Sequence, residues 1–233
     1  MRLKRKFTAF IVLFTFMFLS MSMVVTAVDR DYTPSLSSFE KQNVYTLGKF
    51  TDVDESAWYA PEVAKAYEYG LMSGQANNKF GVTNNMSLAE VITVAARIDS
   101  IFYTGEADFP QSVVWYQTYV DYALKNGILS TPYLDYTVPA TRAQFVEILS
   151  KALPADILNE INLVDDKVIP DVNLNANYYD AVYLFYRAGI VTGTNVDGSF
   201  SPDQTISRPE VAAIVVRMVD IASRQSITLV GEY

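Results

Sequence analysis

The sequence of 233 residues contains neither cysteine nor histidine. The lack of cysteine excludes disulfide bonds and thiolate zinc ligands, and the lack of histidine excludes imidazole ligands and the commonest general base. An enzyme of this composition would depend on carboxylate, Lys, Tyr or Ser chemistry. Basic residues are also scarce, with 18 Lys and Arg against 26 Asp and Glu and a net charge of −8. This acidic balance argues against nucleic-acid binding, which needs a basic surface.

Hydrophobic and aromatic residues, by contrast, are plentiful. They make up 50% and 13% of the chain, and 16 of the residues are tyrosine. Such a composition is typical of a folded chain and not of a disordered one. The length allows one or two domains of about 100–200 residues each.

The first 27 residues have the pattern of a secretory signal peptide. Four basic residues precede an apolar run over residues 7–25, and Ala27 offers a small residue at the cleavage position. The alternative is an uncleaved membrane anchor, because the run approaches the roughly 20 residues that span a bilayer. Cleavage would remove the four basic residues, lower the net charge to −12 and leave no membrane contact. Residues 28–47 are polar and predict a flexible lead-in.

The rest of the chain contains three similar segments. Three alignment columns hold one residue type each: Tyr59, Tyr116 and Tyr178; Val63, Val120 and Val182; and Gly70, Gly127 and Gly189. Apolar residues between the Tyr and Gly columns recur at helical spacing, which predicts about three turns of amphipathic helix in each segment. The glycine follows the last turn, where a left-handed residue ends a helix at low steric cost.

Each segment then contains a capping box, in which Ser or Thr precedes Glu or Gln by three residues. The pairs are Ser87 and Glu90, Thr141 and Gln144, and Ser207 and Glu210. The hydroxyl caps an N–H of the first helical turn, and the Glu or Gln side chain reaches back to the cap residue. The sequence therefore predicts a mainly α fold of stacked helix–loop–helix units. We expect helices at residues 58–69, 88–100, 115–126, 142–152, 177–188 and 208–222.

These motifs resemble the S-layer homology (SLH) repeats of bacterial cell-surface proteins. The third segment is most similar, through residues 169–172, 189–190, 197–202 and 207–210. The first keeps the leading Phe-Thr-Asp-Val motif but has Leu88 where the family places arginine. The second keeps its capping box but has lost the leading Asp and the glycine-containing loop.

The resemblance implies repeats at residues 48–107, 108–168 and 169–222, followed by a tail at 223–233. It also implies that the three repeats pack around a pseudo-threefold axis as a three-pronged spindle. In this family, grooves between the prongs bind secondary cell-wall polymers, which are often pyruvylated polysaccharides attached to peptidoglycan.

Arg142 and Arg208 are the first candidates for carbohydrate binding. Each follows a cap residue at a predicted helix N-terminus, which favours anions, and a guanidinium can hold a carboxylate through two parallel hydrogen bonds. A pyruvyl ketal supplies such a carboxylate. The alternative is that each arginine pairs with a neighbouring Asp or Glu. Since Leu88 cannot pair with a carboxylate, we expect its groove to be weakened or inactive.

Trp58 and Trp115 begin two of the predicted helices and either stack on sugar rings or pack between repeats. Asn177 occupies their column in the third segment. Gly74 and Gly193 either admit a ligand close to the backbone or only supply a positive φ. No metal site or cofactor is expected, because the Asp197-Gly198 loop lacks the key ligand positions of a calcium loop.

These features favour a non-enzymatic anchoring module that is secreted and held at the bacterial cell wall or S-layer surface. Its expected partner is the secondary cell-wall polysaccharide, and a surface-protein partner is a further option. Two alternatives stay open. One is a structural S-layer-associated protein that acts through protein–protein contacts, and the other is a truncated relative of a larger anchored surface enzyme.

Overall fold

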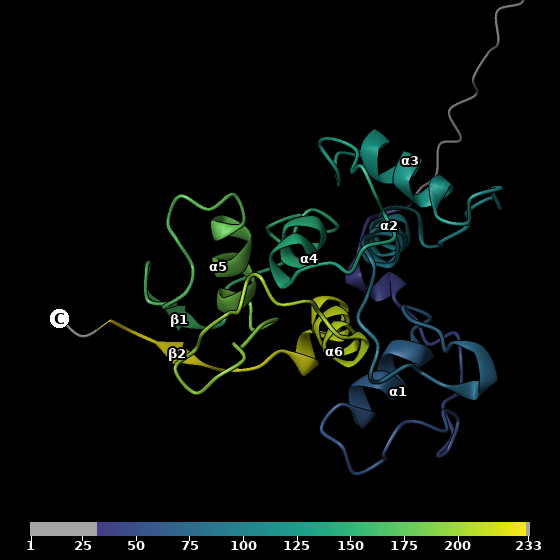
Figure 1. Cartoon of the computed structure of the whole chain (residues 1–233), viewed down its shortest axis with the longest axis horizontal. Coiled ribbons are helices and arrows are strands. Elements are labelled where there is room, and N and C mark those ends of the chain that lie inside the picture. Colours follow the sequence, from purple (N-terminus) through teal and green to yellow (C-terminus); the bar gives the residue numbers. More distant parts are fainter. Residues whose placement is uncertain (1–31, 232–233) are drawn as a thin grey trace, which may run out of the picture. The chain divides into compact units, whose positions relative to one another are not determined.

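The computed structural model describes residues 32–231. Its α-helices start and end within four residues of the predicted ranges: α1 (Ala60–Glu68), α2 (Leu88–Thr104), α3 (Gln117–Lys125), α4 (Arg142–Leu149), α5 (Tyr179–Arg187) and α6 (Arg208–Val219). Three short 3₁₀ turns and the two-residue strands β1 (Leu163–Val164) and β2 (Thr228–Leu229) accompany them (Figure 1). The mainly α fold is therefore confirmed. The predicted signal peptide lies outside the described residues.

Local interactions determine where the helices begin. The Ser87 hydroxyl accepts the N–H of Glu90 at 3.3 Å, and the Glu90 carboxylate accepts the N–H of Ser87 at 2.8 Å. Thr141 and Gln144 make the same reciprocal pair at 3.2 and 2.9 Å, and a third capping box opens α6. These contacts satisfy backbone groups that a helix N-terminus otherwise leaves unpaired.

The glycine that follows the first helix of each segment adopts a left-handed conformation. The φ angles are 67° at Gly70, 77° at Gly127 and 70° at Gly189. This backbone region is costly for residues that carry a Cβ atom, which explains why glycine recurs in this column.

The helices pack in pairs that join different segments of the sequence. α1 packs against α6, α3 against α2, and α5 against α4. Figure 1 shows α2, α4 and α6 between these three outer helices. The first helix of each segment thus covers the second helix of another segment, so no segment buries its apolar surface alone.

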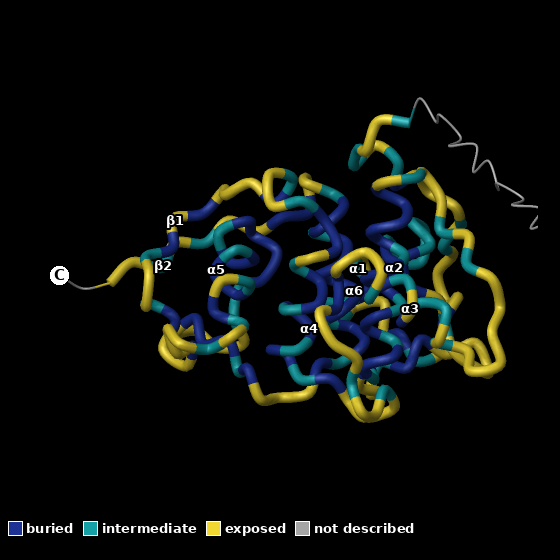
Figure 2. Tube along the Cα trace, turned by 90° about the horizontal axis from the view of Figure 1, so that it is seen from above, coloured by how far each residue is buried: buried dark blue, intermediate teal, exposed yellow. Residues whose placement is uncertain are grey.

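The core is continuous through the described residues. Ten of the 12 residues of α6 are buried, which is expected of a helix that is apolar nearly all round. Phe80 and Phe200, from the loops that precede α2 and α6, are fully buried. Figure 2 shows that buried backbone follows the helices while the connecting loops are mostly exposed.

A closed ring of backbone hydrogen bonds joins the N-termini of α2, α4 and α6. The N–H of Met86 donates to the carbonyl of Ile206 at 2.9 Å. The N–H of Ile206 donates to the carbonyl of Ala140 at 3.1 Å, and the N–H of Ala140 returns to Met86 at 2.8 Å. Each of these residues immediately precedes a cap residue. The three capping boxes therefore lie around one junction.

The segments on either side of the helical region also contact it. Residues 32–47 belong to the predicted flexible lead-in, yet Phe39 is buried and the Tyr32 hydroxyl donates to the Ile101 carbonyl at 3.1 Å. Near the other end, β2 pairs in parallel with β1, and Arg224 donates to the Ile157 carbonyl at 3.1 Å. Both segments thus pack against the helical region through apolar contacts and hydrogen bonds.

None of the helices in residues 32–231 is long and apolar enough to cross a bilayer. The apolar run at residues 7–25 lies outside this range, so the choice between a cleaved signal and a retained anchor stays a prediction.

Candidate functional site

Two cavities lie at equivalent interfaces between the helices, with volumes of about 510 and 420 Å³. Cavity 1 is lined by Gly74, Trp115 and Arg208 among other residues. Cavity 2 is lined by Trp58, Arg142 and Gly193 in the same way. The structure thus sorts the six residues predicted for carbohydrate binding into two sets, each with one Gly, one Trp and one Arg.

Each set combines all three segments of the sequence. In cavity 1 the glycine comes from the first segment, the tryptophan from the second and the arginine from the third. In cavity 2 the tryptophan comes from the first, the arginine from the second and the glycine from the third. Neither cavity can form until the segments have packed together.

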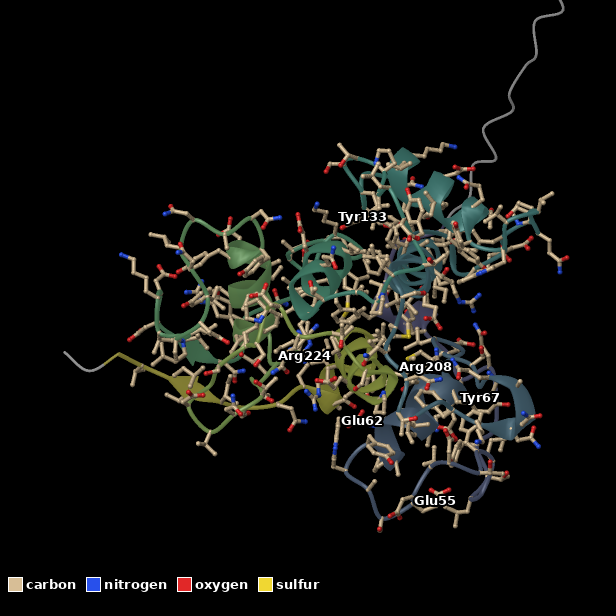
Figure 3. The ribbon with its side chains drawn as sticks, viewed as in Figure 1. Glu55, Glu62, Tyr67, Tyr133, Arg208 and Arg224 are labelled. Atoms are coloured by element: carbon tan, nitrogen blue, oxygen red, sulfur yellow. The ribbon has the colours of Figure 1, made fainter. Side chains whose placement is uncertain are left out.

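Arg208 is the first residue of α6 and lies almost wholly inside the interface with the first segment (Figure 3). It is only 6% exposed. Its Nε donates to the Phe80 carbonyl at 2.8 Å, Nη2 donates to the Ser73 carbonyl at 2.8 Å, and Nη1 donates to Glu90 Oε1 at 3.1 Å. The guanidinium also stacks on the Phe80 ring at 5.0 Å.

Arg142 repeats this arrangement at the start of α4. It is 4% exposed, its Nε donates to the Phe200 carbonyl at 2.7 Å, and Nη1 pairs with Glu210 at 2.7 Å. The guanidinium lies 5.0 Å from the Phe200 ring. Burial lowers the pKa of Arg142, and Glu210 opposes this shift. An arginine remains charged at neutral pH after such a shift.

Both arginines therefore pair with an acid of a neighbouring segment, which is the alternative left open by the sequence. Those acids are Glu90 and Glu210, the last residues of two capping boxes. One Glu90 oxygen accepts from Ser87 and the other from Arg208. The same carboxylate thus caps its own helix and bridges to another segment. The sequence pattern showed only the first of these two roles.

The two tryptophans are exposed, as a binding surface requires. Trp58 is 62% exposed and Trp115 is 54% exposed. Each indole packs its edge against the next residue, Tyr59 at 5.6 Å and Tyr116 at 5.4 Å. Over half of each tryptophan faces solvent at the mouth of a cavity, so burial in a core is not the main role of either one.

Different local constraints explain why Gly193 and Gly74 are glycine. Gly193 has a φ of 90°, so a positive φ explains it. Gly74 does not need a positive φ, but an added Cβ would lie 2.3 Å from Phe50 Cε1 and 3.0 Å from the Lys79 carbonyl oxygen. Close packing of the loop excludes a side chain there. Both positions also line the cavities, so these local reasons leave their ligand-binding role untested.

A second arginine in each cavity was not found from the sequence. Arg97 lines cavity 1 and Arg217 lines cavity 2, each from the helix that also provides the cavity's glutamate. Arg97 donates to the Gly70 carbonyl at 3.0 Å, and Arg217 donates to the Ile190 carbonyl at 3.2 Å. Both follow their helix cap by ten residues, an alignment signal that could have revealed them.

The interface between α2 and α4 differs from the other two. Leu88 takes the position of the buried arginine and is 2% exposed. Asn177 takes the tryptophan column, and its Nδ2 donates to Glu147 Oε2 at 3.0 Å. The capping box of α4 has Gln144 in place of glutamate. The arginine, the tryptophan and the acid are thus all replaced at the same interface.

Two segments of the chain match the S-layer homology domain. These are residues 49–92 and 169–212, which contain the loops and caps of the first and third segments. The S-layer homology resemblance is thus confirmed for those two segments, while the middle segment carries no such match.

A related protein is the "Endoglucanase" of Bacillus sp. (strain KSM-635). It is 21% identical over 199 residues, which make up 85% of this chain but only 15% of the relative. The chain therefore spans a small part of the length of this relative. The similarity concerns that part alone and says nothing of catalysis by this chain.

Proposed function

We propose that this protein is a non-enzymatic module that anchors at the bacterial cell surface by binding secondary cell-wall polymer non-covalently. S-layer homology domains mediate attachment to the cell wall, and two segments of this chain match that domain. The observation that carries the proposal for this chain is the pair of cavities, each combining an exposed tryptophan with a buried arginine.

The proposal includes a third, divergent S-layer homology unit at residues 108–168. α3 packs against α2 and α4 against α5, as α1 packs against α6, and Thr141 opens α4 with a capping box. Each of the three units contributes one equivalent residue, Met86, Ala140 or Ile206, to the closed ring of backbone hydrogen bonds. These contacts support three units around a pseudo-threefold axis, arranged as a three-pronged spindle.

The proposed ligand is a polysaccharide that carries carboxylate groups, such as a pyruvylated polymer attached to peptidoglycan. An indole face offers a stacking surface for a sugar ring, and arginine recognises carboxylates through charge-assisted hydrogen bonds. The chain's net charge of −8 repels a polyanion at long range. Attraction must therefore come from cationic groups inside the cavities.

The test is co-sedimentation of the protein with purified bacterial cell walls, before and after the secondary polymer has been extracted. We expect the protein to sediment with intact walls and to stay in solution after extraction. Retention on extracted walls would contradict polymer binding and favour attachment to peptidoglycan or to a surface protein.

A second candidate role is that of the anchoring part of a larger surface enzyme. The observation that favours it is the match to 15% of an endoglucanase from Bacillus sp. (strain KSM-635). Under this alternative the wall-binding chemistry is unchanged, and the chain has the same expected behaviour in the wall assay.

A further inference from the structure

Arg208, at the N-terminus of α6, has most of its hydrogen-bonding capacity in use, and Arg142, at the N-terminus of α4, has Nε and Nη1 in use. Arg208 donates through Nε, Nη1 and Nη2 to the carbonyls of Phe80 and Ser73 and to the Glu90 carboxylate. Arg142 is 4% exposed and has its own ion pair with Glu210. A ligand carboxylate would have to compete with these built-in partners, so these two arginines are better suited to hold the interfaces together.

The second arginines are in a different situation. Arg97 is half-buried, lines cavity 1 and, among the described residues, its side chain makes a single hydrogen bond, to the Gly70 carbonyl. Within residues 32–231 it has no ion pair with any Asp or Glu. Its charge is therefore available to an anion that enters the cavity.

Arg217, the equivalent residue of cavity 2, already has an acid nearby. Glu62 lies on α1, which packs against α6, and Figure 3 shows Glu62 beside α6. Glu62 Oε2 and Arg217 Nε are both buried, and neither has a hydrogen-bond partner within the described chain. Burial lowers the pKa of Arg217, and the charge of Glu62 opposes that shift. The two groups form no ion pair within the described residues, but the charge of Glu62 lies close enough to act on the pKa of Arg217.

One sequence position accounts for this difference. Glu62 follows Trp58 by four residues, and Tyr119 follows Trp115 by the same interval. Tyr119 lines cavity 1 and adds an uncharged aromatic surface beside Arg97. With Arg208 paired to Glu90, cavity 1 keeps one uncompensated positive charge. In cavity 2 the corresponding charge of Arg217 has the opposite charge of Glu62 nearby, although the two groups form no ion pair within the described residues.

We propose that Arg97, in cavity 1, is the residue that binds the anionic group of the saccharide, and that Glu62 makes cavity 2 the weaker anion site. This inference rests on the proposed function, because it names the subsite of the same polymer. Arg208 and Arg142 then act as positioning residues that hold the cavity walls.

The experiment is calorimetric titration of the protein with a pyruvylated N-acetylmannosamine glycoside and with the same glycoside lacking the ketal. We expect the parent protein to prefer the pyruvylated probe. Arg97→Gln should bind that probe about 10- to 100-fold more weakly, the usual effect of losing a hydrogen bond to a charged group. Arg217→Gln is the matched control and should change the affinity by less than about threefold, within the range of a solvent-screened charge pair.

Two further variants separate charge from folding. Arg97→Lys keeps the positive charge and should retain part of the preference for the pyruvylated probe. Glu62→Gln should strengthen binding at cavity 2 by about two- to fivefold, because it releases the charge of Arg217. Thermal melts of all four variants show whether each one is folded.

The outcomes distinguish the two proposals. Parent protein that binds neither glycoside overturns the proposed function and this inference together. Parent protein that binds both glycosides equally leaves saccharide binding in place but overturns an anion subsite. Unchanged binding by Arg97→Gln, a larger loss in Arg217→Gln, or no gain in Glu62→Gln overturns the assignment to Arg97 and Glu62.

Discussion

The two interfaces that form cavities bury an arginine at the start of a helix, whereas the α2–α4 interface buries Leu88 at the same position. Arg142 and Arg208 are 4% and 6% exposed, and Leu88 is 2% exposed. The position therefore has to be filled, but it does not have to be charged. A well-packed apolar side chain can replace a buried ion pair with little loss of stability.

The facing residue changes together with this position. Glu210 and Glu90 accept the arginines, while the corresponding box at α4 has Gln144. A partly buried carboxylate without its cation loses part of its stabilisation, so replacing the arginine favours replacing the acid as well. The comparison teaches that the ion pairs are one of two solutions to the same packing problem. Arginine and tryptophan occur together at cavities 1 and 2, the two places where we propose that the ligand binds.

The largest expected effect on stability comes from replacing Arg208 and Glu90, first singly and then together, by the residue types found at the α2–α4 interface. Arg208→Leu leaves Glu90 and two backbone carbonyls without their donor, and we expect the free energy of unfolding to fall by about 3 kcal/mol. The double variant Arg208→Leu/Glu90→Gln copies the α2–α4 interface and should recover at least about 1 kcal/mol of that loss. Urea unfolding of the parent, both single variants and the double variant gives the coupling free energy. Strictly additive losses would contradict the idea that the two solutions are interchangeable.

The second prediction compares the tryptophan column across the interfaces. Trp115→Ala removes an exposed indole at cavity 1 and should weaken wall binding about tenfold, as truncation of an aromatic anchor does. Asn177→Ala, at the interface without tryptophan, should leave wall binding unchanged. Sedimentation with purified walls over a range of protein concentrations measures both, with the exposed Val113→Ala as a control. Equal losses in Trp115→Ala and Asn177→Ala would mean that the third interface also binds polymer.

The capping boxes are common to all three interfaces, so their loss should cost about the same at each. Thr141→Ala and Ser87→Ala should each lower the free energy of unfolding by about 0.5–2 kcal/mol, the usual loss for a cap hydroxyl. Denaturant unfolding measures the effect, and Thr46→Ala, an exposed threonine outside any helix, is the control. A midpoint unchanged by Thr141→Ala would show that α4 does not depend on its cap.

The smallest expected effect on stability concerns Asp52, in the loop of the first segment. The second segment has no aspartate at the corresponding position. Burial raises the pKa of Asp52, but hydrogen bonds from the N–H groups of Phe80, Gly81 and Val82 outweigh it and lower the pKa overall. Because the folded-state pKa lies below the unfolded value, the stabilisation by Asp52 is present above about pH 4 and is lost as the pH falls through the folded pKa. Asp52→Asn should therefore be less stable than the parent at pH 7, by a margin that shrinks towards pH 2. Thermal melts across this range measure the difference, and a margin that grows on acidification would contradict the assignment.

Much of the local structure could be predicted from the sequence. The six helices follow from a 3.6-residue apolar period, and the starts of α2, α4 and α6 follow from a hydroxyl residue placed three residues before Glu or Gln. The left-handed glycines follow from the same columns. These features depend on residues close in the chain, so their physical causes are visible without a fold.

The candidate site was predicted only as separate residues. Arg208, Trp115 and Gly74 were each singled out by their column, but the sequence did not show that they line one cavity. Arg97 was missed altogether, because an arginine on the solvated side of an amphipathic helix looks ordinary in a sequence. Pairing of Arg142 with a neighbouring Asp or Glu was left as an alternative to ligand binding, and only the structure identifies the acid as Glu210.

The sequence by itself thus determined the helices, the caps of α2, α4 and α6, and the similarity of three helix–loop–helix segments, because short-range hydrogen bonds and apolar periodicity are local properties of the chain. Only the tertiary structure decided which arginine meets which glutamate, that one interface lacks both the charge and the tryptophan, and that Glu62 lies near Arg217 whereas Tyr119 takes the equivalent place at cavity 1. Those outcomes depend on contacts between residues far apart in the sequence, 118 positions for Arg208 with Glu90 and 68 positions for Arg142 with Glu210. Burial and electrostatic pairing at such contacts exist only after the three segments have packed against one another.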